Sequence, residues 1–222
     1  MTLAVRAAAL NYRDIMLATG LLPPEAGEVG IGGDRPGFEC AGIVTAVGAG
    51  VDGLTVGDRV CAAVPACLAS HTVAPASAVV RIPDGLGFAA AATLPVAFLT
   101  VHYALHDLAR LAGGETVLVH GAAGGVGLAA LQYARLVGAQ VIATAGSPVK
   151  RDLLRALGVE HVLDSRSLEF AGQALRITGG RGWTWWSTRW PGRPSTGAWR
   201  RCGPAVGSSS SASATSTPTS RF

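Results

Sequence analysis

The hydrophobic and polar positions of the first 93 residues follow the short-period pattern of β-strands. Short apolar runs alternate with turns rich in glycine, a residue that permits positive φ, and such spacing predicts a small barrel-like β unit. The expected strands are residues 3–9, 40–47 and 58–64, with a short helix from Asn11 to about Gly20. A loop rich in proline and glycine separates that helix from the second strand.

From residue 88 onward the pattern changes to helices that alternate with buried strands. Helices are expected at 88–94, 96–111, 128–136 and 149–157, and strands at 116–120, 141–145 and 161–164. Strands that alternate with helices in this way predict parallel βαβ units. The chain is therefore expected to be an α/β protein, with a β-rich part up to residue 93 and a doubly wound parallel sheet from residue 94 to 182.

The stretch 115–127 carries the clearest chemical motif of the chain. An apolar strand runs into the turn Gly-Ala-Ala-Gly-Gly-Val-Gly, and a helix follows at once. The spacing Ala122-x-Gly124-x-x-Gly127 is the dinucleotide fingerprint with alanine at its first glycine. Backbone N–H groups at a helix N-terminus bind phosphate, so we expect a pyrophosphate at Ala122, Gly124, Gly125, Val126 and Gly127. The alternative is a plain strand–helix turn.

A second turn, after the strand 141–145, bears on the choice of dinucleotide. An acidic residue about 20 positions after the fingerprint would bind the 2′-hydroxyl of NAD. The chain has no acid here, but it has Ser147, Lys150 and Arg151. A hydroxyl and two cations suit the 2′-phosphate of NADP. The alternative is a solvated helix start with incidental charges.

Composition excludes several other classes of protein. No apolar run reaches the roughly 18–20 residues of a membrane span, so no membrane partner is expected. The four cysteines lack the paired spacing of a zinc site or a disulfide framework, and a cytoplasmic location is the default. The formal charge is +4, but residues 183–222 contain five arginines and no acid, which leaves −1 for residues 1–182. Nucleic-acid binding is therefore not expected.

Residues 183–222 differ in composition from everything before them. All five tryptophans lie here, followed by a run rich in serine, alanine and threonine. A low-complexity tail is one interpretation. Tryptophan has a single codon, however, and shifting the frame by one base across residues 183–186 forces Asp and Val. The shifted frame is compatible with Val-Asp-Val-Val-Val-Asn-Ser-Leu-Ala-Gly, a buried strand and loop of the kind a parallel sheet needs next. Our hypothesis is that the chain is translated out of frame from about residue 183.

Five ordered motifs resemble the medium-chain dehydrogenase/reductase superfamily, and most closely the enoyl reductase domains of polyketide and fatty acid synthases. They are Ala8–Met16, Gly37–Gly42, Val56–Val60, Leu94–Thr100 and the fingerprint turn. The resemblance implies a GroES-like substrate domain at 1–93, a Rossmann NADP-binding domain at 94–182, and a tail at 183–222. It also implies that both domains are incomplete, so we expect this polypeptide to be unstable or inactive.

The resemblance also assigns roles to residues outside the fingerprint. Asn11 and Thr100 match positions near the nicotinamide, with loop ordering and helix capping as their respective alternatives. Tyr12 is a candidate acid, or else a packing residue. The family has a lysine at the position of Lys150, and this lysine is expected to bind the 2′-phosphate. Metal is not expected, because Phe38 stands where zinc-binding relatives have histidine, and each of the five histidines is interpreted as structural.

The implied reaction is hydride transfer from NADPH to the β-carbon of an enoyl thioester tethered to an acyl carrier protein, followed by protonation at the α-carbon. One alternative is a free-standing quinone oxidoreductase with the same fold and cofactor. Another is a catalytically inactive remnant that at most binds nucleotide. The oligomeric state stays open, with a homodimer as one option.

Overall fold

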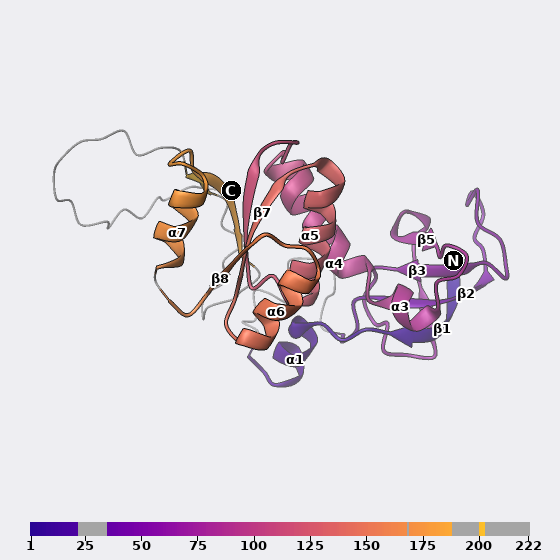
Figure 1. The fold of residues 1–222 in the computed structure, drawn as a ribbon. Helices are drawn as coiled ribbons and strands as arrows, with labels where there is room; N and C mark the ends of the chain where they lie inside the picture. The colour runs from indigo at the N-terminus through magenta and orange to yellow at the C-terminus, as the bar shows by residue number, and fades with distance from the viewer. Residues whose placement is uncertain (22–34, 168, 188–199, 203–222) are drawn as a thin grey trace, which may run out of the picture.

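The computed structural model describes residues 1–21, 35–167, 169–187 and 200–202. Two sheets with their helices lie side by side, one antiparallel and one mainly parallel (Figure 1). Most of the predicted proline- and glycine-rich loop, at 22–34, lies outside the described residues, as does most of the predicted tail. No described helix combines the length and the apolar character needed to cross a bilayer.

The first sheet has five strands in the order β4-β1-β2-β3-β5, all antiparallel. Its strands are β1 (Thr2–Ala8), β2 (Cys40–Ala46), β3 (Arg59–Ala62), β4 (His71–Val73) and β5 (Val79–Arg81). The first three were predicted. The other two, with the 3₁₀ turn η1 (Ala76–Ala78) between them, were missed because three residues are too few for an alternating pattern to show.

Side chains of this sheet alternate between two buried faces. Leu3, Cys40, Val44 and Val60 pack together on one face. On the other face Ala41 packs with Ile82 and with helix α3 (Phe88–Ala92). Helix α1 (Tyr12–Ala18) follows β1 directly, as predicted.

The second sheet has the strand order β10-β9-β6-β7-β8. Its strands are β6 (Thr116–His120), β7 (Gln140–Ala145), β8 (His161–Asp164), β9 (Trp183–Ser187) and β10 (Arg200–Cys202). All neighbours are parallel except β9 and β10. The run β8-β7-β6-β9 is the 3-2-1-4 order of a dinucleotide-binding sheet. In this order, successive strands are added on one side of β6 up to β8, and β9 is then added on its other side. The predicted parallel βαβ units are confirmed.

Helices cover both faces of this sheet. On one face Val117, Val119 and Ala143 pack in a core that includes residues of α4 (Pro95–Val101), α5 (Gly125–Val137) and α6 (Pro148–Ala156). On the other face Leu118 and Ile142 pack against α7 (Phe170–Ile177), a helix that was not predicted. Because alternate residues of each strand point to opposite faces, both faces are buried.

Two helix predictions need correction. The single helix expected at 96–111 is α-helical only to Val101 and continues as the π-helix η2 (His102–Leu108), ending before Arg110, which has φ of 51°. Helix α5 begins three residues before the predicted residue 128. Gly125 and Gly127, interpreted as turn residues, in fact form its first turn.

The predicted tail also begins inside the sheet, because residues 183–187 form β9 beside β6. Trp183 packs with Leu118 and Ile142, and its indole Nε1 is buried without a hydrogen-bond partner among the described residues. A buried donor without an acceptor is unfavourable, so this tryptophan fits the position poorly.

Candidate nucleotide and substrate site

The fingerprint turn joins β6 to α5 as the sequence predicts. Gly124 is the N-cap residue of α5, in an extended conformation, and no side chain caps the first turn. The first N–H groups of an α-helix have no partner within the helix, and they carry the positive end of its dipole. The start of this 13-residue helix is therefore suited to bind an anion.

The glycines of the turn show which parts of it are tightly packed and which are open. A Cβ atom added at Gly127 would lie 2.5 Å from the carbonyl oxygen of Ala122, and Ala122 itself is fully buried. A Cβ at Gly125 would meet nothing within 4 Å. Gly127 thus brings helix and strand together, while open space lies beside Gly125, and both features fit a dinucleotide pyrophosphate.

The second predicted turn lies at the same edge of the sheet. Strands β6 and β7 are parallel neighbours, with His120 beside Thr144 in register. Thr144 Oγ1 lies 2.9 Å from His120 Nδ1 and accepts a 3.3 Å hydrogen bond from Gly121 N, while Ala122 N donates to the Thr144 carbonyl oxygen at 3.0 Å. Thr144 therefore fixes the fingerprint turn to the strand that leads into α6.

The three residues predicted for the 2′-phosphate differ in how they are engaged. Ser147 is the N-cap of α6 and accepts a hydrogen bond from Lys150 N at 3.4 Å. The Lys150 side chain is exposed and makes no ion pair within the described chain. The guanidinium of Arg151, by contrast, lies 3.0 Å from the Asp164 carboxylate and 3.1 Å from the Ala145 carbonyl oxygen. Of the two cations expected to bind the phosphate, Arg151 is already paired with Asp164, and only Lys150 has no ion pair among the described residues.

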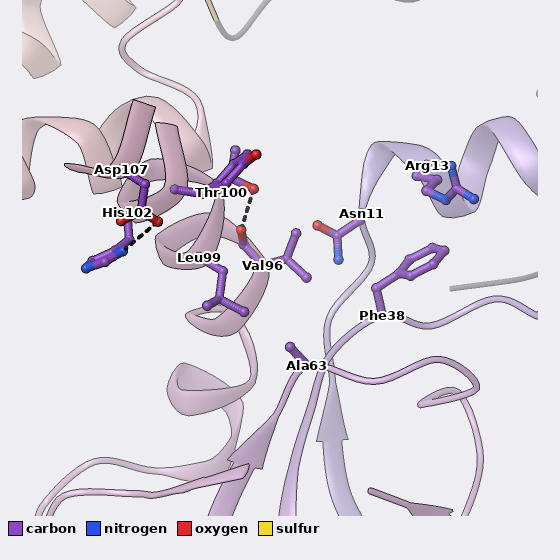
Figure 2. Close-up of a pocket in the computed structure, with 10 residues that line it drawn as sticks. Asn11, Arg13, Phe38, Ala63, Val96, Leu99, Thr100, His102 and Asp107 are labelled. Carbon is purple, nitrogen blue, oxygen red and sulfur yellow. Dashed lines mark hydrogen bonds and ion pairs between the residues drawn. The ribbon is translucent and has the colours of Figure 1, made fainter. Parts of the chain in front are cut away.

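A cavity of about 490 Å³ lies between the start of α1, the end of the first sheet and helix α4 (Figure 2). Its walls are mostly apolar, and Arg13, whose guanidinium carbon lies 5.4 Å from the centre of the Phe38 ring, is on its α1 side. The lining residues are Asn11, Arg13, Phe38, Ala63, Val96, Leu99, Thr100, His102, Tyr103 and Asp107. An apolar cavity with a few polar groups is the usual form of a small-molecule site.

Asn11 and Thr100, predicted to lie near one ligand, line this cavity from opposite sides. Thr100 Oγ1 donates to the Val96 carbonyl oxygen at 2.7 Å, one turn back in α4. The capping alternative for Thr100 is therefore wrong, since its hydroxyl lies inside the helix and not at its N-cap. That hydroxyl keeps its lone pairs as acceptors toward the cavity.

Tyr12 is the first residue of α1, and its side chain is 65% exposed. It is not among the residues that line the cavity. Such exposure contradicts the packing alternative, and its role as an acid stays a prediction.

Sequence reasoning missed two buried carboxylates beneath the cavity. Glu39 accepts hydrogen bonds from Asn11 Nδ2 at 2.9 Å and from Val96 N at 2.8 Å. Asp14 accepts from Gly37 N at 2.6 Å and from Asn11 N at 2.7 Å. Both residues are only 3% exposed. Burial, with a smaller contribution from the charge of Asp14, raises the pKa of Glu39 above its usual value.

The histidines are less scattered than the sequence suggests. The rings of His102 and His106 lie with centroids 4.5 Å apart and planes tilted by 33°, and His106 Nδ1 lies 3.1 Å from the Tyr133 hydroxyl. Burial and the nearby Asp107 raise the pKa of Tyr133. His120, bonded to Thr144, also packs against Phe170. Within the described ranges no group of three or more His, Cys, Asp or Glu side chains is arranged to hold a metal ion.

Comparison with known proteins matches both halves of the chain to family models. Residues 1–100 match the alcohol dehydrogenase GroES-like domain, and residues 125–185 match the zinc-binding dehydrogenase domain. The phthioceranic/hydroxyphthioceranic acid synthase of Mycobacterium tuberculosis is 46% identical over 180 residues, 81% of this chain and 8% of the synthase. The chain belongs to the medium-chain dehydrogenase/reductase family, as an enoyl reductase domain of the polyketide synthase type.

Solved structures agree with this assignment of the enoyl reductase domain. The CurK enoyl reductase superposes with a TM-score of 0.75 at 42% identity, over 82% of this chain and 56% of that one. An Escherichia coli quinone oxidoreductase, solved with NADPH, gives 0.68 at 33% identity, over 82% and 55%. The chain spans about half the length of these structures and less than a tenth of the synthase. The predicted resemblance and the α/β fold class, with GroES-like and Rossmann parts, are confirmed.

Proposed function

We propose that the chain binds NADPH and reduces the carbon–carbon double bond of an enoyl thioester carried on an acyl carrier protein. The observation that carries the proposal is the fingerprint turn, which lies at the end of β6 in a sheet of 3-2-1-4 order. Helix α5, which follows the turn, packs on α4, and α4 forms one wall of the cavity. The NADPH complex of the Escherichia coli relative supports the cofactor, and the synthase relative supports the substrate class.

Each part of the site has a role in this proposal. The turn from Ala122 to Gly127 holds the pyrophosphate through backbone N–H groups, with Gly124, Gly125 and Val126 closest to it. Ser147 and Lys150 bind the 2′-phosphate, and Arg151 holds the second turn to Asp164. Asn11 and Thr100 orient the nicotinamide half against the enoyl group.

Bound NADPH supplies a hydride to the β-carbon, and a proton added at the α-carbon completes the reduction while the cofactor becomes NADP⁺. The apolar walls formed by Phe38, Val96 and Leu99 exclude water from the reacting atoms. No metal takes part in the proposed reaction, because Phe38, at the position where zinc-binding relatives have histidine, offers no ligand atom. Tyr12 is the proposed proton donor on the family resemblance alone, since it does not line the cavity, and Tyr12→Phe tests this role.

The proposed organisation follows the two sheets. A GroES-like unit comprises residues 1–93 and a Rossmann unit residues 94–182, with the out-of-frame segment after them. An acyl carrier protein would deliver the substrate to the cavity, in the cytoplasm.

The test is NADPH oxidation by the purified chain with crotonyl thioester, with butyryl thioester as a control that has no double bond to reduce. A small quinone replaces the thioester in a parallel assay, because the quinone oxidoreductase relative favours that second function. Thioester-dependent oxidation supports the enoyl reductase and contradicts the expectation that this polypeptide is unstable or inactive. Oxidation with quinone alone supports the alternative. NADPH binding without either reaction would leave a nucleotide-binding remnant and refute the proposed catalysis.

A further inference from the structure

One buried carboxylate contacts both walls of the cavity. Glu39, at the end of the segment that leads into β2, receives the Asn11 side-chain amide on one oxygen at 2.9 Å. Its other oxygen receives the backbone N–H of Val96, in the first turn of α4, at 2.8 Å. Asn11 stands on one side of the cavity and Val96 on the other, so Glu39 holds the two sides in one arrangement (Figure 2).

This contact also determines which end of the Asn11 amide faces the cavity. An ionised carboxylate only accepts hydrogen bonds, so the amide nitrogen must be the atom that faces Glu39. Helix α1 begins with a reciprocal capping box: the Asn11 side chain faces the backbone N–H of Asp14, and the Asp14 carboxylate accepts from the Asn11 backbone N–H at 2.7 Å. The amide oxygen has two lone pairs, so one of them stays available to the cavity. Figure 2 shows the Asn11 oxygen turned toward the helix that carries Val96 and Thr100.

We propose that Glu39 is a positioning residue, which orients the Asn11 amide so that its Oδ1 presents a hydrogen-bond acceptor to the cavity. The matching ligand group is a donor, such as the carboxamide N–H or a ribose hydroxyl of the nicotinamide half of the cofactor. This inference rests on the proposed function for the identity of the ligand. The orientation of the amide does not depend on it.

The amide orientation can be measured without ligand, because Asn11 is the only asparagine in the chain. Full-length protein labelled with ¹⁵N-asparagine gives a single side-chain NH₂ pair in a proton–nitrogen correlation spectrum. Bonding of one proton to Glu39 predicts two well-separated proton shifts, with slow exchange of the bonded proton. In Glu39→Gln the separation should shrink and exchange should speed up at least tenfold. A pair at random-coil positions in the wild type, or one that Glu39→Gln leaves unchanged, would overturn the proposal.

The kinetic arm separates positioning from general damage to the fold. Misorientation of a bound reactant by about 1 Å lowers the rate about 100-fold, so Glu39→Gln should lower kcat for thioester reduction by 10- to 100-fold. The Kd for NADPH should change less than threefold, because the pyrophosphate contacts at α5 are intact. Glu115→Gln is the matched control, since Glu115 also accepts a backbone N–H, from Ala112 at 2.9 Å, but lies outside the cavity lining.

The two hypotheses fail in different ways. A protected Asn11 amide in a wild-type chain that neither binds nor oxidises NADPH refutes the proposed function and leaves the amide orientation standing. An active wild type in which Glu39→Gln alters neither the amide pair nor kcat refutes the role of Glu39. Asn11→Asp provides a second variant in case Glu39→Gln does not fold: it places a carboxylate against Glu39 and should lower kcat in the same way.

Discussion

Gly127 lies so close to the backbone of Ala122 that position 127 has no room for a side chain. A Cβ atom at Gly127 would lie 2.5 to 2.6 Å from three backbone atoms of Ala122, including its carbonyl oxygen. Because those atoms belong to the backbone of a fully buried residue, they cannot move aside as a flexible side chain would. The contact fixes where α5 begins relative to β6, and so where its first N–H groups point.

Gly127→Ala should therefore damage both the fold and the nucleotide site. We expect a loss of about 2–3 kcal/mol in the free energy of unfolding, typical of overpacking in a rigid core, together with loss of NADPH binding. Urea unfolding and fluorescence titration measure the two effects.

Gly125→Ala is the matched control for stability. Its Cβ would meet nothing within 4 Å, and alanine is favoured over glycine in a helix by up to about 1 kcal/mol. We expect unchanged or slightly increased stability. Equal stabilities for the two variants would mean that the close contact at Gly127 does not constrain the turn.

Lys150 and Arg151 should have separable effects, although they are neighbours at the start of α6. Lys150→Ala should weaken NADPH binding at least tenfold and leave NADH binding nearly unchanged, because a 2′-phosphate loses a charge-assisted contact. Arg151→Ala should mainly lower stability, since its guanidinium bonds Asp164 and the Ala145 carbonyl oxygen. Binding constants for both nucleotides with both variants test this. A Lys150→Ala protein with unaltered preference between NADPH and NADH would show that another group binds the phosphate.

The raised pKa of Glu39 predicts a pH-dependent stability. The folded protein holds this proton more tightly than the unfolded chain, whose carboxyl titrates near 4.5. Relative to Glu39→Gln, the wild type should therefore lose stability as pH rises from about 4.5 through the folded pKa, and then level off. Urea midpoints of both proteins between pH 4 and 8 measure the difference. A difference that grows in favour of the wild type with rising pH would contradict the burial of this carboxylate.

Trp183→Phe should stabilise the chain by about 1 kcal/mol, because it removes a buried indole N–H that has no partner among the described residues and keeps a ring in the cluster with Leu118. Trp183→Ala, which also removes the ring, should destabilise instead. Thermal unfolding compares them. The same misfit is what a frame change near residue 183 would produce, and sequencing the coding region tests that hypothesis independently.

Strands β6, β7 and β8 of the parallel sheet were predictable because each has a short apolar centre and lies between helical segments. The fingerprint was predictable because its glycines are required by contacts within a few residues of the chain, such as the close approach of Gly127 to the backbone of Ala122. Thr144 was not found, because a threonine at the end of an apolar strand has no special pattern. Its hydrogen bonds to the preceding turn appear only when β6 and β7 are placed side by side.

The carboxylates beneath the cavity were missed for a similar reason. Glu39 lies within a recognised motif, but its partners are 28 and 57 residues away in the chain, so only the fold brings them together. Arg151 shows the opposite limit. From the sequence, the charge of Arg151 suited a phosphate site. Its ion pair with Asp164 forms only because β7 and β8 are paired in the sheet.

The central claim, a cofactor site that begins at Gly124 and selects NADPH through Lys150, is tested most directly by titrating the full chain with NADPH and NADH. The single lysine makes the readout specific, since acylation of its amine can be followed by mass spectrometry. We predict saturable NADPH binding, at least tenfold tighter than that of NADH, with NADPH alone protecting Lys150 from acylation. Equal affinities, or acylation of Lys150 that NADPH does not slow, would contradict the account.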